Sequence, residues 1–356
     1  MKTAVSRYGF INAKLRARIS DILPEKLTES LIQTGSLEET FQVLRETPFA
    51  PLAEAYDRTG DLQYTELELF RMQIAVYREI VKYATDSVQE FVKGLSLKLE
   101  VENFKNVLRL WFGSKVKKRP ISHRAGYLYT ETILHPLDWD RIINAETFQE
   151  LTEAVDVDLY RRILEPFLEL PLEEIGIFKI ETSLDRMYYR TLFEKSAGLP
   201  RRDRELVEKI LRTEIDLQNI SWLIRYSHFY KVDAAGLSEI LIPLGRTLEQ
   251  KDIEAYLSQE GRMKDPAALL KGRFPALASL SLADRGTHAA QALLFEQLLD
   301  ETTKTEFIKL ISGYPFTIGI ILVYFFMKSR ESRFIMGVLN GKYYGLKPDR
   351  IRDVTG

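Results

Sequence analysis

The feature that most constrains the fold of this chain is an internal repeat with a period of about 110 residues. A corner of apolar residues leading into a proline occurs three times, at Pro24, Pro136 and Pro243. A period of this length is the size of a domain, and three copies account for almost all of the 356 residues. We therefore predict three similar domains, packed side by side with pseudo-threefold symmetry, with an open curved row of domains as the alternative. Their expected extents are residues 1–115, 116–230 and 231–356.

Two further features recur with the same period. The sequence ETFQVL at 39–44 is answered by ETFQEL at 146–151, and a weaker copy lies at 252–257. An asparagine also recurs within or beside an apolar helical stretch. Because a buried amide must find partners for its donors and its acceptor, we expect these asparagines and the three prolines to define the repeat structurally, not to catalyse. The asparagines are Asn12, Asn106 and Asn219.

Helix signals dominate the chain from end to end, and the alternation typical of strands is nearly absent. The apolar segment 315–327 is predicted to form a buried core helix, because helical spacing continues through Phe334 and Leu339. The expected fold class is all-α. Four capping-box patterns mark expected helix starts. They are Ser36-x-x-Glu39, Thr65-x-x-Glu68, Thr247-x-x-Gln250 and Thr303-x-x-Glu306.

The composition excludes several classes of function. The chain has no cysteine, which rules out disulfides, a cysteine nucleophile and thiolate metal sites. With 50 Lys and Arg against 51 Asp and Glu, it lacks the basic excess that binding to nucleic acid requires. The first twenty residues contain no apolar run of signal-peptide length. The apolar segment 315–327 is shorter than the roughly 20 residues needed to cross a bilayer. We expect a cytoplasmic protein.

No motif for catalysis, cofactor binding or metal binding is complete in the sequence. The four histidines share no metal-ligand spacing. The segment from Gly337 to Tyr343 is one residue short of a phosphate loop, and Tyr343 stands where Ser or Thr should hold magnesium. We therefore expect no catalytic residue, cofactor, metal or small-molecule substrate. An enzyme would need a site assembled from distant residues, such as perturbed carboxylates around a buried histidine.

Two basic clusters are the candidate contacts with partners. One lies at the predicted junction of the first two domains, and the other precedes a long helical stretch. Such runs are commonly solvated loops, and the alternative is contact with an anionic surface of a partner. The residues are Lys115, Lys117, Lys118 and Arg119 in the first cluster and Arg201, Arg202 and Arg204 in the second.

Four segments of the chain match a known family in the right order. They are YGFINAKLR at 8–16, LDRMYY at 184–189, EIDLQN at 214–219 and GKYYGL at 341–346. Together they resemble the family of C subunits of V-type and A-type ATP synthases, whose vacuolar members are called d subunits. The resemblance covers nearly the whole chain, although Phe334 stands where asparagine is expected and the loop at 261–275 is longer than usual.

What the resemblance implies is a funnel of three helical domains on the cytoplasmic face of the membrane proteolipid ring, with a cavity that receives the central shaft. The chain would then be a non-catalytic, peripheral coupler of ring and shaft in ATP synthesis or hydrolysis. We expect a polar, charged surface toward the ring and an apolar socket for the shaft. The competing reading is a helical-repeat scaffold that binds partner helices and is unrelated to rotary ATPases.

Overall fold

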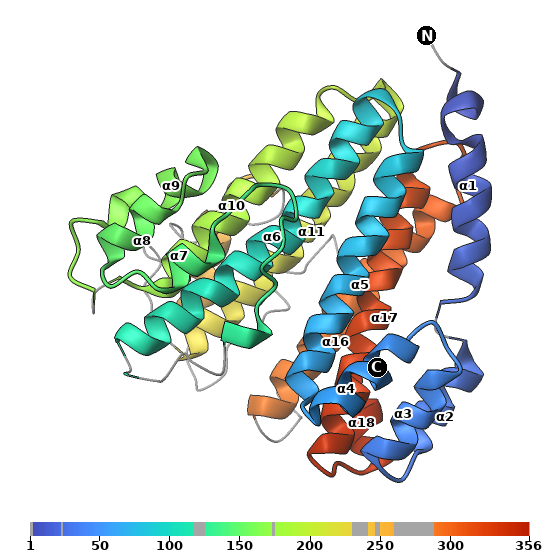
Figure 1. The fold of residues 1–356 in the computed structure, drawn as a ribbon. Helices are drawn as coiled ribbons and strands as arrows, with labels where there is room; N and C mark the ends of the chain where they lie inside the picture. The colour runs from blue at the N-terminus through green and yellow to red at the C-terminus, as the bar shows by residue number, and fades with distance from the viewer. Residues whose placement is uncertain are drawn as a thin grey trace. The chain divides into compact units, whose positions relative to one another are not determined.

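The computed structural model describes residues 3–22, 24–116, 118, 125–172, 175–229, 241–245, 250–259 and 288–355. These residues form helices joined by turns and contain no strand, which confirms the predicted all-α class (Figure 1). The α-helices are α1 (Ala4–Ser20), α2 (Glu25–Gln33), α3 (Leu37–Arg45), α4 (Ala50–Thr59), α5 (Leu62–Tyr83), α6 (Asp86–Lys115), α7 (Trp139–Ile143), α8 (Phe148–Ala154), α9 (Asp158–Leu164), α10 (Ile177–Ser196), α11 (Arg201–Phe229), α13 (Gln250–Leu257), α16 (His288–Ile311), α17 (Gly319–Tyr343) and α18 (Pro348–Thr355). Two short 3₁₀ helices span Ala125–Tyr127 and Glu165–Phe167.

The chain divides into two compact units. Unit 1 comprises Met1–Leu184 together with Tyr324–Gly356, and unit 2 comprises Asp185–Val323. Unit 1 is therefore discontinuous in sequence, since helices from both ends of the chain belong to it. The boundaries at 115 and 230, the pseudo-threefold arrangement and the funnel stay predictions.

One of the predicted capping boxes, at Ser36, marks a helix start, and a further box that was not predicted stands at Thr147. Ser36 caps α3 through a 3.1 Å hydrogen bond from the Glu39 amide, and the Glu39 carboxylate accepts from Gly35 N. Thr147 caps α8 through a 3.1 Å bond from the Glu150 amide. Both boxes satisfy amides that have no partner inside the helix.

Two other predicted capping-box patterns, at Thr65 and Thr303, do not mark helix starts. Thr65 lies inside α5, whose N-terminal cap is Asp61, with Oδ1 accepting from Gln63 N at 2.9 Å. Thr303 lies inside α16 and donates to Leu299 O, one turn back. A hydroxyl in a helix can bond to the preceding turn, so the pattern alone does not locate an end. Thr247 lies outside the described residues.

The first core of unit 1 joins helices from the two ends of the chain. Leu31 of α2, Phe41 of α3 and Leu52 of α4 pack with Phe334 of α17 and Ile351 of α18. The dark red end of α17 lies beside these blue helices in Figure 1. Burial of large apolar side chains contributes about 1.5–3 kcal/mol each, so this cluster holds the discontinuous unit together.

The predicted core helix is present as α17. It begins at Gly319, and its apolar residues from Ile320 to Phe325 are all buried. The helix continues to Tyr343, as the spacing beyond residue 327 predicts. The prediction of a buried helix is therefore confirmed, with a start four residues later than the apolar segment because the residues from Pro315 to Ile318 form the turn before it.

Helix α1 is attached to α5 by a small polar network. Its buried residues include Tyr8, Ile11 and Leu15. Both terminal nitrogens of Arg18 donate to the Glu79 carboxylate of α5 at 2.7 Å. These hydrogen bonds from Arg18 lower the pKa of Glu79 to about 2. A bidentate pair of this geometry fixes the direction of the helix as well as its position.

Unit 2 has its own core along α11. Ile210, Ile215 and Leu223 are buried on this helix. The buried carboxylate of Asp203, in the first turn, accepts from Ile318 N at 3.0 Å and so fixes the turn that leads into α17. An acidic residue in this position also complements the positive end of the helix dipole.

Candidate functional site

The one described cluster that resembles an acid-base site surrounds Glu100 in the middle of α6. Its carboxylate is fully buried. One oxygen accepts from the amides of Leu134 and His135 at 2.8 and 2.7 Å, and the other accepts from Tyr160 Oη at 2.7 Å and lies 2.6 Å from His135 Nδ1. The carboxylate thus holds the corner that precedes Pro136.

The electrostatics of this cluster favour an ionised Glu100. Burial opposes the charge, but the hydrogen bonds from His135, Tyr160 and Leu134 outweigh it, and the net pKa of Glu100 is lowered. Burial and the nearby carboxylate raise the pKa of Tyr160. With four donors on two sealed oxygens, Glu100 has no accessible lone pair for a substrate, so the arrangement stabilises a loop and offers no general base.

A related arrangement holds the corner before Pro243 in unit 2. Asn219 of α11 is buried, donates to Ile242 O at 2.9 Å and accepts from Ile242 N at 2.9 Å. One turn earlier, buried Asp216 lies so close to Gly245 that a Cβ there would be 2.5 Å from Asp216 Oδ1. A side chain on the long helix therefore fixes the loop corner here too.

The third long helix, α17, carries the same pattern in altered form. Glu331 is buried, and Lys328 is its ion-pair partner one turn earlier. Three residues on, Phe334 replaces the amide and packs into the apolar cluster of unit 1. A phenyl ring removes the need for backbone partners at this place, so the departure from asparagine is explained by apolar packing.

These three helices share one pattern, of which the sequence revealed the copies at Asp216 and Glu331 but not the copy at Glu100. Each carries a buried acid followed three residues later by another buried side chain: Glu100 with Asn103, Asp216 with Asn219, and Glu331 with Phe334. Three residues is nearly one helical turn, so both side chains point to the same face. The recurrence of an acid at about 115 residues could have located the inner face of each helix.

The predicted asparagines occupy different environments. Asn12 is buried in α1, and its Oδ1 accepts from Arg16 Nε at 3.2 Å. Asn106 lies on the exposed face of α6 and accepts from Arg109 at 3.1 Å. The buried amide of α6 is Asn103, which donates to Tyr129 O at 2.8 Å.

The predicted prolines stand at loop corners. Pro24 is the residue before α2 and forms its N-terminal cap position. Pro136 and Pro243 each follow a residue that a long-helix side chain holds by its backbone, His135 and Ile242. The role of the asparagines and prolines in defining the repeat remains a prediction.

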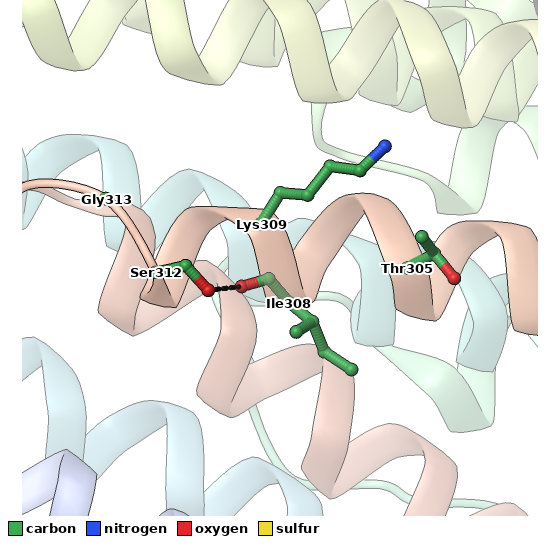
Figure 2. Close-up of a pocket in the computed structure, with 5 residues that line it drawn as sticks. All are labelled: Thr305, Ile308, Lys309, Ser312 and Gly313. Carbon is green, nitrogen blue, oxygen red and sulfur yellow. Dashed lines mark hydrogen bonds between the residues drawn. The ribbon is translucent and has the colours of Figure 1, made fainter.

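Among the remaining described residues, neither a metal site nor a substrate pocket stands out. Within the residues that the structure describes, no three His, Asp or Glu side chains lie close enough to hold a metal ion. A surface depression of about 420 Å³ lies at the end of α16, where Ser312 Oγ donates to Ile308 O (Figure 2). Its one charged lining residue, Lys309, pairs with Glu306. The depression therefore lacks the converging polar groups of a substrate pocket.

The second basic cluster is exposed at the start of α11. The Arg201 side chain is 88% exposed and pairs with Glu205 at 2.8 Å. The Arg202 guanidinium lies 4.3 Å from the ring centre of Tyr314. Arg204 lies 3.9 Å from Glu208. Cations in a first helical turn oppose the helix dipole, so the local acids offset part of their cost.

The first basic cluster is only partly described. Lys115, at the end of α6, binds Glu146 at 2.6 Å. Lys118 adopts a left-handed backbone with φ of 52°, while Lys117 and Arg119 lie outside the described residues.

Comparison with known proteins gives a consistent result along the chain. The sequence model of the family described as ATP synthase (C/AC39) subunit matches residues 11–354. The A-type ATP synthase C subunit of Methanocaldococcus jannaschii is 22% identical over 354 residues, covering 98% of this chain and 86% of that protein. The proteins of the same name from Thermococcus onnurineus and Methanosarcina mazei are each 24% identical, and 90% and 93% of their lengths are covered. Among the described helices, none has the length and hydropathy of a membrane span.

Proposed function

The chain belongs to the ATP synthase (C/AC39) subunit family, and on that basis we propose that it couples a rotor ring to a central shaft. It is a subunit of an A/V-type ATP synthase, and the proposed role within that complex is mechanical and non-catalytic. The observation that carries the proposal is the match of nearly the whole chain, residues 11–354, to this family. The same family match argues against the alternative, a helical-repeat scaffold unrelated to rotary ATPases.

The chemistry of the described residues supports a non-catalytic role. The buried acid Glu100 is bonded to four donors of its own loop. Asp203 binds the turn before α17, and Asn219 binds the corner at Ile242. These buried polar groups are engaged in holding loops to long helices, which is what a rigid transmission element requires.

We place the proposed coupler on the cytoplasmic face of the membrane, attached through its partners. The partners would be the proteolipid ring and the central shaft subunits, with no nucleic acid and no small-molecule substrate. Three similar domains, at 1–115, 116–230 and 231–356, would distribute contacts around the ring. Three long helices each carry a buried acid followed three residues later by a second buried side chain. This recurrence supports the threefold organisation.

A coupler must resist slipping under load. Each translocated charge carries about 2.3 kcal/mol per 100 mV, whereas an exposed ion pair contributes about 0–1 kcal/mol. Many simultaneous contacts are therefore needed. The clusters at Lys115–Arg119 and Arg201–Arg204 are the proposed contacts with the ring, because they are the two concentrations of cations in the sequence and cations pair with an anionic surface.

The test is attachment of the ring in the assembled synthase. Reversing the charge of Lys117, Lys118 and Arg119 together, or of Arg201, Arg202 and Arg204 together, should reduce co-purification of the ring with the shaft. The matched control reverses three exposed cations elsewhere, Lys26, Arg58 and Lys98. Unchanged co-purification in both cluster variants would remove these residues from the proposed interface. A wild-type chain that purifies with neither ring nor shaft would overturn the coupling role.

A further inference from the structure

The first turn of α11 is bound at two adjacent residues to the turn that joins α16 and α17. The buried carboxylate of Asp203 accepts from Ile318 N at 3.0 Å, and the Arg202 guanidinium lies over the ring of Tyr314, 4.3 Å from its centre. Tyr314 also contacts Phe316 edge to face, with ring centres 5.7 Å apart. All five residues belong to unit 2. The guanidinium is therefore held against a ring that is itself fixed in place.

The charge of Arg202 is compensated less than the charges of its neighbours. Arg201 pairs with Glu205 at 2.8 Å, and Arg204 lies 3.9 Å from Glu208. Within the part of the chain that the structure describes, the exposed Arg202 forms no ion pair and no hydrogen bond, and its contact is the tyrosine ring. The face of a ring attracts a cation but carries no net charge. One positive charge of the cluster is thus held in place without a carboxylate.

The chemistry of a guanidinium decides what it can bind. Its five N–H donors point outward in the plane of the group, and contact with a ring supplies them with no oxygen acceptor. A carboxylate matches this edge, because it accepts two parallel hydrogen bonds. Tyr314 is 41% exposed, so a partner can reach the pair. Since the ring already restricts the long side chain, less conformational entropy is lost when an acid binds.

We propose that Arg202, held against Tyr314, is the anchor for a carboxylate on an exposed loop of the proteolipid ring. This proposal rests on the proposed coupling function and deepens it, since it assigns the contact to one residue of the second basic cluster. Arg201 and Arg204 have acids of their own helix beside them, so an acid of the ring would add little there. Tyr314 is a positioning residue that acts through the arginine.

The experiment measures binding of the full chain to the purified proteolipid ring. Arg202→Gln should weaken binding about tenfold, whereas Arg201→Gln and Arg204→Gln should each change it less than about twofold. Arg202→Lys keeps the charge without the planar fork, and its affinity should fall between those of Arg202→Gln and wild type. The matched control is Arg190→Gln, which removes an exposed arginine of α10 in the same unit.

A second set of variants tests the aromatic contact. Tyr314→Ser should weaken ring binding about two- to fivefold, and Tyr314→Phe should bind as the wild type does, because the face of the ring is kept. In the Arg202→Gln background, Tyr314→Ser should have no further effect, since the tyrosine acts through the arginine. Equal weakening in both backgrounds would mean that Tyr314 has a purely structural role. Thermal melts check folding, and the exposed change Arg202→Gln carries the test alone if Tyr314→Ser melts lower.

The chemistry of the partner is tested on the ring itself. Exposed carboxylates of the purified ring can be capped with a water-soluble carbodiimide and a neutral amine. This treatment should remove the difference in affinity between wild type and Arg202→Gln. Vesicles of anionic lipid without the ring present the other source of anionic groups at a membrane, and on them the two proteins should differ by less than about twofold.

Three results would overturn the proposal. Equal ring binding by wild type and folded Arg202→Gln would remove the anchor and leave the coupling role intact. A difference between these two proteins that persists on the capped ring, or that is found only with anionic vesicles, would assign another ligand to Arg202. A wild-type chain that does not bind the ring would overturn the proposed function and this inference together.

Discussion

At the scale of single residues, buried polar side chains of the long helices bind the backbone of loop corners. Glu100 binds the backbone before Pro136, and Asn219 binds the backbone before Pro243. A proline corner lacks one amide hydrogen and cannot continue a helix, so its backbone groups need partners from elsewhere. Long helices supply them with one acid or amide each.

Removing the carboxylate of Glu100 should therefore be costly. Glu100→Ala leaves two amides, an imidazole and a phenol without their acceptor, and we expect a loss of about 3–5 kcal/mol in the free energy of unfolding. Glu100→Gln keeps one acceptor oxygen and should lose about 1–3 kcal/mol. Chemical denaturation measures both. Glu102→Ala, exposed on the same helix, should stay within about 0.5 kcal/mol of wild type; equal effects at 100 and 102 would contradict the corner-holding role.

The Arg18–Glu79 pair makes a prediction about pH. The hydrogen bonds from Arg18 hold the pKa of Glu79 at about 2 in the folded chain, below its ordinary value of 4.5. A lowered pKa stabilises the fold above the unfolded value, and this stabilisation is lost as pH falls from about 5 to about 2. The stability difference between wild type and Glu79→Gln should therefore shrink over that range. A difference independent of pH would show that the carboxylate charge is not what attaches α1.

At the scale of elements, helix ends are decided by backbone geometry that sequence patterns only partly reveal. The capping boxes at Ser36 and Thr147 are real starts, whereas Thr65 and Thr303 are interior. The four patterns look alike in sequence. What distinguishes them is whether another cap residue stands one turn earlier. Asp61 already caps α5, so the hydroxyl of Thr65 lies inside that helix.

Glycines at two helix ends should respond in opposite directions to alanine. Gly345→Ala places a Cβ on a left-handed backbone and should destabilise the chain by about 1–2 kcal/mol. Gly113→Ala adds a methyl in open space near the end of α6 and should stabilise it by about 0.5–1 kcal/mol. Thermal or urea unfolding compares the two. Parallel changes in stability would mean that the left-handed backbone at Gly345 is not what fixes the end of α17.

At the scale of the whole molecule, the sequence predicted the class of fold better than its assembly. The helical content, the buried apolar helix and the family follow from periodicity and from ordered motifs. The sequence did not predict that unit 1 combines both ends of the chain. Phe334 and Ile351 join α2–α4 only through long-range apolar packing, which leaves no local signal in the sequence. Asn106 satisfied the repeat pattern in sequence, yet the buried amide of α6 is Asn103, nearly one turn earlier. The contact residues of the site remain predictions, since exposed cations look alike with and without a partner.

The core that joins both ends of the chain can be tested by a substitution in α17 and a measurement in α2–α4. Phe334→Ala removes a buried ring from the cluster with α2–α4 and should cost about 3–5 kcal/mol. Hydrogen exchange should rise in α2, α3 and α4, which are distant in sequence. Asn340→Ala, exposed on the same helix, is the control. Faster exchange confined to α17 would contradict a shared core.

The joining of the two chain ends also sets the order of events during synthesis. Helices α2–α4 emerge early, but the side chains that cover them, Phe334 and Ile351 among them, follow about 275 or more residues later, roughly 14–55 s at ribosomal speed. Until then the apolar faces of α2–α4 lack their partners. Because Phe334 and Ile351 belong to this late segment, a prematurely terminated chain would carry an unfinished core. The core of unit 1 can therefore be completed only after translation of the chain is nearly finished.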